Sequence, residues 1–296
     1  MRDDVMKKYD LVAIGAISKD RNVVMGNEEV RYGGGSYCAA FASINSGFAT
    51  AVITKLARED LQSLHPFQDA GIDVYSASSS QTTSIKNVYT TPDLDRRTCH
   101  KLAMADPFCV EDIPNDIDVG VYQIAALIAG EVPLEVLKHL AEKGKVGLDA
   151  QGFVRKAVGS DLISEDWPEK QEAFQYIDFL KTDAAEAEIL TGEADRNKAI
   201  RMLADMGAKE IILTHSSEVT AYASGQIYHA EFKPQNLSGR TGRGDTCFAT
   251  YLTQRLRKGP RESLNYAAAL TSIKMETPGP FEGDIADVEA LLATYS

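Results

Sequence analysis

The chain has 296 residues and carries 43 acidic against 31 basic side chains, a formal net charge of −12. An acidic surface repels phosphate backbones and anionic lipid headgroups, which argues against nucleic acid and membranes as partners. It does not exclude an anionic ligand at a locally positive site. The first ten residues lack the apolar run of a signal peptide, and no stretch reaches the ~18 apolar residues of a membrane span. We therefore expect a cytoplasmic protein whose four separated cysteines stay free.

In chain order, short apolar runs alternate with helical patterns. The first run, 11–15, ends at a glycine and is followed by a helical pattern at 39–46. Further strands are predicted at 51–54, 119–124, 146–149, 179–181 and 211–214, with helices at 134–143, 184–191 and 197–206. This alternation predicts one α/β domain, a mainly parallel sheet covered by helices on both faces.

Two stretches in the first third interrupt this pattern and resemble β-hairpins. Residues 21–25 and 28–32 flank Gly26-Asn27, and residues 84–90 and 96–102 flank the segment 91–95. We predict that these insertions pair into a small β-sheet beside the main domain.

The segment with the clearest chemistry is Leu237-Ser-Gly-Arg-Thr-Gly-Arg-Gly-Asp-Thr-Cys-Phe-Ala-Thr250. Its glycines precede a helical pattern that ends at Gly259-Pro260. A glycine-rich turn that leads into a helix presents several backbone N–H groups to one point, where the helix dipole favours negative charge. The segment therefore predicts an anion-binding turn.

Asp245 stands where a phosphate-binding loop of the Walker type would require lysine, so that type of loop is excluded. A carboxylate beside an anion-binding turn can instead accept the proton of an attacking hydroxyl while the turn holds the phosphoryl group. The alternative is that Asp245 only caps a helix, and the segment alone does not separate the two.

The same segment resembles the C-terminal signature of the ribokinase/PfkB family, Asp-Thr-x-Gly-Ala-Gly-Asp. Thr241, Gly242, Gly244 and Asp245 match it, whereas Arg243 replaces alanine and Gly239 replaces the leading aspartate. Gly33-Gly-Gly-Ser-Tyr-Cys-Ala-Ala40 is similar to the family's N-terminal Gly-Gly-x-x-x-Asn-x-Ala, with Cys38 in place of asparagine. Asp183-Ala-Ala-Glu186 resembles Asn-x-x-Glu, and Thr214 ends a strand where the family contacts ATP.

The resemblance implies a ribokinase-like three-layer αβα domain over residues 1–296, with a β-sheet lid formed by segments 18–34 and 73–102. It implies ATP and Mg²⁺ as cofactors and a sugar or cyclitol as acceptor. Asp245 would be the base, beside an anion cradle of Gly242, Arg243 and Gly244. The implied contacts are Asp20, Gly33, Gly34, Gln151 and Arg155 for the acceptor, Thr214, Ser216, Thr241, Gly242 and Gly244 for ATP, and Asp183 and Glu186 for magnesium through water.

Each assignment has a structural alternative. Asp20 could begin a turn, Arg155 could form a surface salt bridge, and the glycines could only permit tight backbone geometry. Asp183 and Glu186 could serve only the first turn of a helix, and Arg243 could reach the phosphate or fold outward.

Segments 149–155 and 274–281, and the pair of segments 83–89 and 95–97, are similar to inositol-kinase-like members, so a myo-inositol-like acceptor is favoured. A nucleoside kinase and a non-catalytic binder of the same fold remain alternatives. The lid edges could also pair two copies of the chain into a homodimer.

Overall fold

The computed structural model describes residues 6–89 and 97–295, and the middle of the molecule is a sheet that is nine-stranded over these residues. Its strands are, in spatial order, β15 (Gln226–Glu231), β14 (Glu218–Ala223), β13 (Glu210–Thr214), β12 (Phe179–Asp183), β9 (Lys145–Asp149), β8 (Ile117–Ile124), β1 (Lys7–Ile14), β4 (Thr50–Leu56) and β5 (Asp73–Ser78). The strands from β13 to β5 are parallel, and β14 and β15 extend the edge as an antiparallel hairpin. The predicted three-layer α/β fold is confirmed.

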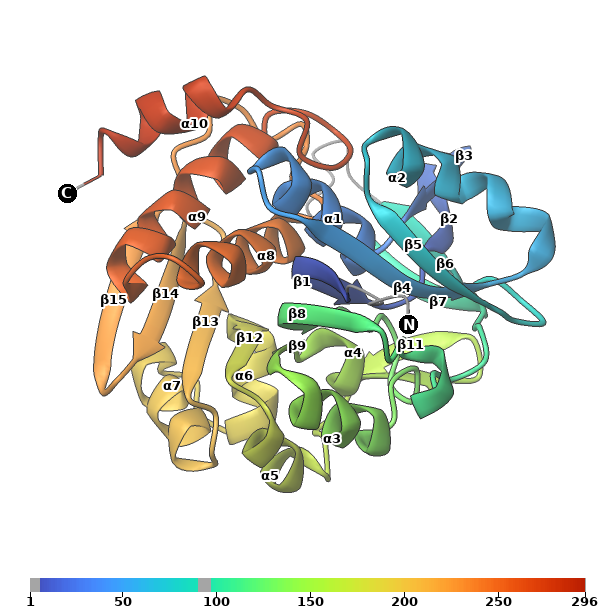
Figure 1. Cartoon of the computed structure of the whole chain (residues 1–296), viewed down its shortest axis with the longest axis horizontal. Helices are drawn as coiled ribbons and strands as arrows, with labels where there is room; N and C mark the ends of the chain where they lie inside the picture. The colour runs from blue at the N-terminus through green and yellow to red at the C-terminus, as the bar shows by residue number, and fades with distance from the viewer. Residues whose placement is uncertain (1–5, 90–96, 296) are drawn as a thin grey trace, which may run out of the picture.

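Helices cover both faces of this sheet (Figure 1). One face carries α1 (Gly35–Asn45), α8 (Arg243–Arg255), α9 (Pro260–Lys274) and α10 (Ile285–Leu292), and the other carries α3 (Leu134–Lys143), α6 (Ala184–Thr191) and α7 (Arg196–Asp205). The short helices are α2 (His65–Asp69), α4 (Gln151–Val154) and α5 (Lys170–Ala173).

Strand β1 shows how the sequence forms two cores. Leu11 and Ala13 pack with the α1, α8 and α9 side, whereas Val12 and Ile14 pack with the α3, α6 and α7 side. Successive side chains of a strand point to opposite faces, so a strand covered on both faces reads as one continuous apolar run. This explains the pattern at 11–15.

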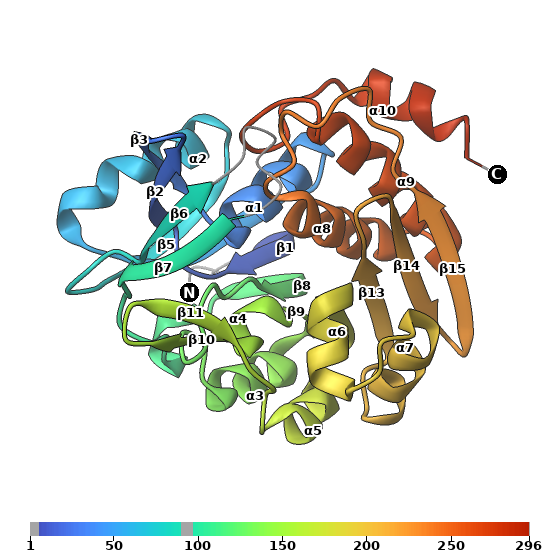
Figure 2. The same cartoon turned by 180° about the vertical axis from the view of Figure 1, so that it is seen from behind.

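A second sheet, six-stranded over the described residues, lies at one end of the large sheet (Figure 2). Its order is β10 (Arg155–Val158), β11 (Asp161–Ser164), β7 (Arg97–Ala103), β6 (Ser84–Tyr89), β2 (Ser18–Val24) and β3 (Asn27–Gly33). Both expected hairpins are found in it, β2–β3 and β6–β7. The turn expected at 91–95 lies outside the described residues.

The bounds of the small sheet differ from those predicted. Residues 73–78, assigned to a lid from sequence, form β5 and pair in parallel with β4 in the large sheet. The small sheet instead recruits β10 and β11 from the middle of the chain. Lid closure, and pairing of two copies through this sheet, stay predictions. Across residues 6–89 and 97–295, no helix has the length and apolar character to span a bilayer.

Candidate active site

The glycine-rich turn leads directly into α8, as predicted. Gly242 is the N-cap residue and adopts a left-handed backbone, with φ 82° and ψ 8°. A side chain is disfavoured there by conformation and also by space, because a Cβ would lie 2.5 Å from Sγ of Cys38 on α1. The turn is therefore pressed against α1.

The backbone N–H groups at the start of α8 have few protein partners. The N–H of Arg243 donates to the Arg240 carbonyl at 3.3 Å, and that of Thr246 makes the first helical bond to Gly242 at 3.0 Å. Within the part of the chain that the structure describes, the N–H groups of Gly242, Gly244 and Asp245 have no acceptor. The available donors are thus Gly242, Gly244 and Asp245, because the predicted contribution of the Arg243 N–H is already used.

Asp245 lies in the first turn of α8 and faces the beginning of α1. A Cβ at Gly35, the first residue of α1, would lie 2.6 Å from Oδ1 of Asp245. The carboxylate accepts no hydrogen bond from the described residues and is only half-buried. A helix cap would be bonded to backbone N–H groups, so the geometry favours a carboxylate that is free to accept a proton.

Arg243, the residue that most distinguishes this turn, folds across it and not away from it. Its Nη1 donates to the Ser216 carbonyl at 3.3 Å, and its guanidinium carbon lies 5.8 Å from the centre of the Phe232 ring. Its Nε is buried and has no hydrogen-bond partner among the described residues. Burial, and then the nearby charge of Arg240, lower the pKa of Arg243. An unpaired, partly desolvated guanidinium here is suited to a bidentate anion.

Beneath the turn lies a buried ion cluster that sequence reasoning missed. Lys181 on β12 is 5% exposed and its Nζ lies 3.0 Å from Oδ1 of Asp149 and 3.8 Å from Oε2 of Glu186. A Cβ at Gly244 would lie 3.0 Å from Cε of Lys181, so the lysine supports the turn directly. Burial lowers the pKa of Lys181, but the charges of Asp149, Glu186 and Asp245 raise it overall. The lysine therefore stays charged.

The predicted magnesium residues form a reciprocal helix cap. Oδ1 of Asp183 accepts the Glu186 N–H at 2.8 Å, and Oε2 of Glu186 accepts the Asp183 N–H at 2.8 Å. No cluster of three or more histidine, cysteine, aspartate or glutamate side chains in the described ranges could hold a metal. Both carboxylates are thus engaged in capping α6, and their predicted contact with Mg²⁺ through water stays a prediction.

Of the predicted acceptor residues, three are connected to the turn through a neighbouring residue, Gly33 and Gly34 through Gly35 and Gln151 through Asp149. Gly33 ends β3, Gly34 caps α1 immediately before Gly35, and the N–H of Gln151 donates to Oδ1 of Asp149 at 3.0 Å. Asp20 and Arg155 instead lie on β2 and β10 of the small sheet, separated by β6, β7 and β11. Asp20 accepts the Ile85 N–H at 3.4 Å.

The predicted ATP residues meet at the other side of the turn. Thr214 is buried at the end of β13, and its Oγ1 is 3.9 Å from where a Cβ of Gly244 would lie. Ser216 is exposed and contributes its carbonyl to Arg243, while the Thr241 carbonyl accepts a hydrogen bond from Lys274. The strand ends of β9, β12 and β13 thus converge below the turn, at the edge where open α/β sheets bind ligands.

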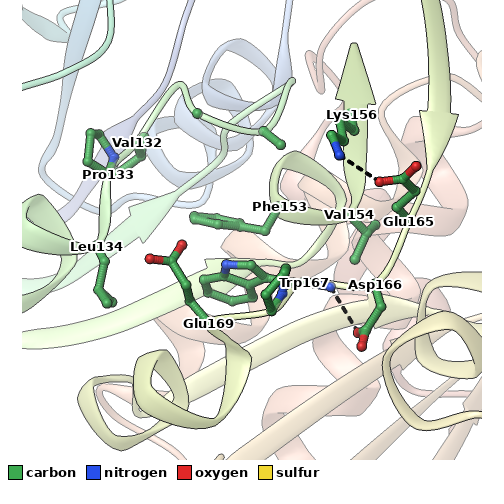
Figure 3. Close-up of a pocket in the computed structure, with 13 residues that line it drawn as sticks. Val132, Pro133, Leu134, Phe153, Val154, Lys156, Glu165, Asp166, Trp167 and Glu169 are labelled. Carbon is green, nitrogen blue, oxygen red and sulfur yellow. Dashed lines mark hydrogen bonds and ion pairs between the residues drawn. The ribbon is translucent and has the colours of Figure 1, made fainter. Parts of the chain in front are cut away.

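A separate cavity of about 380 Å³ lies beside α4 (Figure 3). Phe153 and Trp167 pack against each other in it at 4.4 Å between ring centres, and Lys156 pairs with Glu165 at 2.8 Å on its rim. The cavity contains neither the turn nor Asp245. It is therefore distinct from the candidate site.

Comparison with known families identifies a match across almost the whole chain. The pfkB family of carbohydrate kinases matches residues 3–285. A cytidine kinase of Thermococcus kodakarensis is 25% identical over 268 residues, which cover 86% of this chain and 91% of that protein.

Solved structures extend the match. A pyrophosphate-dependent kinase of the ribokinase family, complexed with a pyrophosphate analogue and myo-inositol, is 38% identical and covers 95% of this chain and 99% of its own, with a TM-score of 0.87. A pyrophosphate-dependent myo-inositol-1 kinase converted into a myo-inositol-3 kinase is 37% identical, covers 96% and 98%, and also has a TM-score of 0.87. Arabidopsis thaliana ribokinase with ribose and ATP, 19% identical over 97% and 99%, shares the fold with a TM-score of 0.75.

Proposed function

Because the chain belongs to the pfkB family of carbohydrate kinases, we propose that it transfers a phosphoryl group from inorganic pyrophosphate to a hydroxyl of myo-inositol or a close cyclitol. The observation that carries the proposal is the free carboxylate of Asp245, which lies at the first turn of α8 and against the first residue of α1. Phosphoryl transfer to an alcohol requires a proton acceptor next to hydrogen-bond donors that can bind the phosphoryl group.

The proposed step uses this chain's own groups as follows. Asp245 accepts the proton of the acceptor hydroxyl as its oxygen forms a bond to phosphorus. The bond from phosphorus to the bridging oxygen of the donor breaks, and phosphate leaves. The free N–H groups of Gly242, Gly244 and Asp245 hold the phosphoryl oxygens on which charge accumulates. Asp183 and Glu186 would hold a hydrated magnesium ion, which would supply positive charge to the transferred phosphoryl group.

Pyrophosphate is preferred here to the ATP expected from sequence, and the choice rests on two observations. The two relatives at 37% and 38% identity are pyrophosphate-dependent. In addition, Arg243 places a guanidinium with an unpartnered Nε between the turn and Ser216, the region predicted to contact ATP. Pyrophosphate has charged oxygens at both ends, so a cation at this position can bind its leaving phosphate directly.

A myo-inositol-like acceptor is supported by the same relatives and by polar groups that come from different elements. Gln151 begins α4, and the backbone of Gly33 and Gly34 joins β3 to α1. A cyclitol has hydroxyls around its whole ring, so several donors and acceptors from separate elements suit it. We propose that the small sheet, with Asp20 and Arg155, closes over this acceptor and excludes water.

One matrix of assays tests donor and acceptor together. Pyrophosphate and ATP would each be combined with myo-inositol, ribose, fructose, cytidine and adenosine, with magnesium present, and products followed by phosphorus NMR. We expect the highest kcat/KM for pyrophosphate with myo-inositol. A higher value with ATP would reject the donor proposal, and a higher value with cytidine or adenosine would favour the nucleoside kinase. If ligands bind but none of the combinations gives turnover, the result would favour the non-catalytic binder.

A further inference from the structure

A second buried lysine, Lys274, lies beside the anion-binding turn. It is the last residue of α9 and is 2% exposed. Its Nζ donates to the Gly239 carbonyl at 2.5 Å and also to the Thr241 carbonyl. One ammonium thus joins two backbone oxygens of the segment that immediately precedes Gly242.

The same segment is tied to the residues after α9 by its backbone. The N–H of Gly239 donates to the Met275 carbonyl at 2.8 Å. A Cβ at Gly239 would overlap the Thr277 carbonyl, which accounts for glycine where the family signature has aspartate. The carbonyls of 239 and 241 therefore point toward α9, and the free N–H groups that follow them belong to the turn.

The charge environment of Lys274 differs from that of Lys181. Lys181 has carboxylates at 3.0 and 3.8 Å, whereas Lys274 forms no ion pair with a described carboxylate. Its neighbour Cys38 is neutral, because burial raises the pKa of that thiol to about 12. Burial lowers the pKa of Lys274, and the carboxylate of Asp245, which is not within ion-pair distance, only partly opposes this.

A buried ammonium without a counter-ion is unfavourable in a folded protein. The turn carries free N–H donors at the same place, and Nζ of Lys274 lies 3.7 Å from where a Cβ of Gly242 would be. An anion held by the turn would therefore supply a negative charge at ion-pair distance, which no described carboxylate provides for this lysine.

We propose that Lys274 is a positioning residue for phosphoryl transfer, whose ammonium fixes the Gly239 and Thr241 carbonyls and adds a buried positive charge next to the bound phosphoryl group. This proposal rests on the proposed function and adds to it a residue outside the family signature. By drawing both carbonyls to one side, the ammonium keeps the following N–H groups directed at the phosphate.

The test compares Lys274→Ala and the isosteric Lys274→Met with Lys233→Met as a matched control. Lys233 also donates to a backbone carbonyl and a hydroxyl, those of Thr294 at 3.1 Å, but it is exposed and its ammonium lies over the Tyr295 ring near the end of the chain. We expect kcat/KM for the donor to fall by about 10²-fold in both Lys274 variants and to be unchanged in the control.

The decisive readout is chemical rescue. Ammonium chloride should raise the rate of Lys274→Ala by about tenfold at constant ionic strength, because a small cation can occupy the vacated volume between the carbonyls. Tetramethylammonium should not, because it is too large and donates no hydrogen bond. Wild type should not respond to either salt, because its own ammonium fills the position.

The outcomes separate this proposal from the function on which it rests. Wild-type rates in either Lys274 variant, or a folded Lys274→Ala that ammonium does not rescue, would overturn the positioning role while leaving the kinase intact. If neither variant folds by circular dichroism, Lys274 is needed for the fold and the proposal is wrong. If wild type shows no turnover, calorimetry with pyrophosphate decides: loss of binding in Lys274→Met supports the role, and unchanged or absent binding rejects it.

Discussion

The turn at 239–245 and the small sheet meet at Gly33–Gly35, where β3 ends and α1 begins, yet they are built differently. The turn is supported by buried groups from β12, β13 and α9, namely Lys181, Thr214 and Lys274. The small sheet is largely exposed to solvent along its β2–β3 hairpin. Met25 and Val30 are 64% and 49% exposed, and every β3 residue from Asn27 to Arg31 is exposed.

This difference matters because packing and charge act on the two regions unequally. Groups in a dense, desolvated environment hold their positions, and small displacements there cost reaction rate. Side chains on an exposed sheet can be exchanged with little effect on stability. We therefore expect substitutions at the turn to change kcat, and substitutions on the acceptor side to change the choice and affinity of acceptor.

The largest expected effect is that of Asp245→Asn. Asparagine keeps the shape of the side chain but cannot take the hydroxyl proton, so kcat should fall by about 10²–10⁴ while the donor still binds. The control is Asp287→Asn, which changes an exposed aspartate in the first turn of α10. Steady-state kinetics and donor calorimetry would measure both. Near-wild-type turnover by Asp245→Asn would show that the turn does not supply the base.

The turn could be predicted from sequence because its signals are local. A left-handed backbone at Gly242 and a tight approach of Gly35 to Asp245 both demand glycine, and glycine runs before helices are easily recognised. The bounds of α3 and α6 were also predicted correctly from their patterns, 134–143 and 184–191.

The supporting groups were not predictable in the same way. Lys181 ends a predicted strand and was read as part of it, and Lys274 was read only as the first residue of the segment 274–281 that is similar to inositol-kinase-like members. Their roles depend on contacts between residues more than thirty positions apart, such as Lys181 with Asp149 and Lys274 with Gly239. A charged residue inside a buried segment is the one local signal that could have identified them.

The hairpin β14–β15 and the strands β10 and β11 were missed for another reason. Ser224 and Gly225 both have positive φ, 50° and 81°, and form a tight turn between β14 and β15 that a search for parallel strands overlooks. Strands β10 and β11 are only four residues each and partly exposed, so their pattern is too short to recognise. Residues 73–78 were assigned to the lid because they come shortly before the predicted hairpin 84–102 in the chain.

A smaller effect is expected on the acceptor side, from Gln151→Leu. If Gln151 binds an acceptor hydroxyl, its loss leaves that hydroxyl without a partner and costs ~1–3 kcal/mol, about 10- to 100-fold in kcat/KM for the acceptor. The donor KM should stay unchanged, because the link between Gln151 and the cluster beneath the turn is its backbone N–H bond to Asp149, which leucine keeps. Gln171→Leu, on the exposed surface of α5, is the control. An equal fall in kcat/KM for the donor and for the acceptor would contradict the proposal that the turn binds the donor and Gln151 binds the acceptor.

The smallest expected effect concerns the charge beneath the turn and is measured as stability. Burial raises the pKa of Glu186 to about 7, partly offset by Lys181. Between pH 4.5 and 7 the folded protein then keeps a proton on Glu186 that the unfolded chain, with an ordinary glutamate, has lost. This contribution to the free energy of unfolding is fully present below about pH 4.5 and is lost as the pH rises to about 7.

Glu186→Gln should remove this pH dependence, because glutamine resembles the protonated side chain and can still cap α6. Its melting temperature relative to wild type should therefore rise between pH 5 and pH 8, by roughly 2 °C or more. Glu188→Gln, on the exposed face of the same helix, should show no such trend. Melting curves by differential scanning calorimetry at pH 5, 6, 7 and 8 would measure the difference. A constant or decreasing difference would mean that Glu186 is ionised in the folded protein, held by Lys181, and that the cluster beneath the turn has one more negative charge at neutral pH.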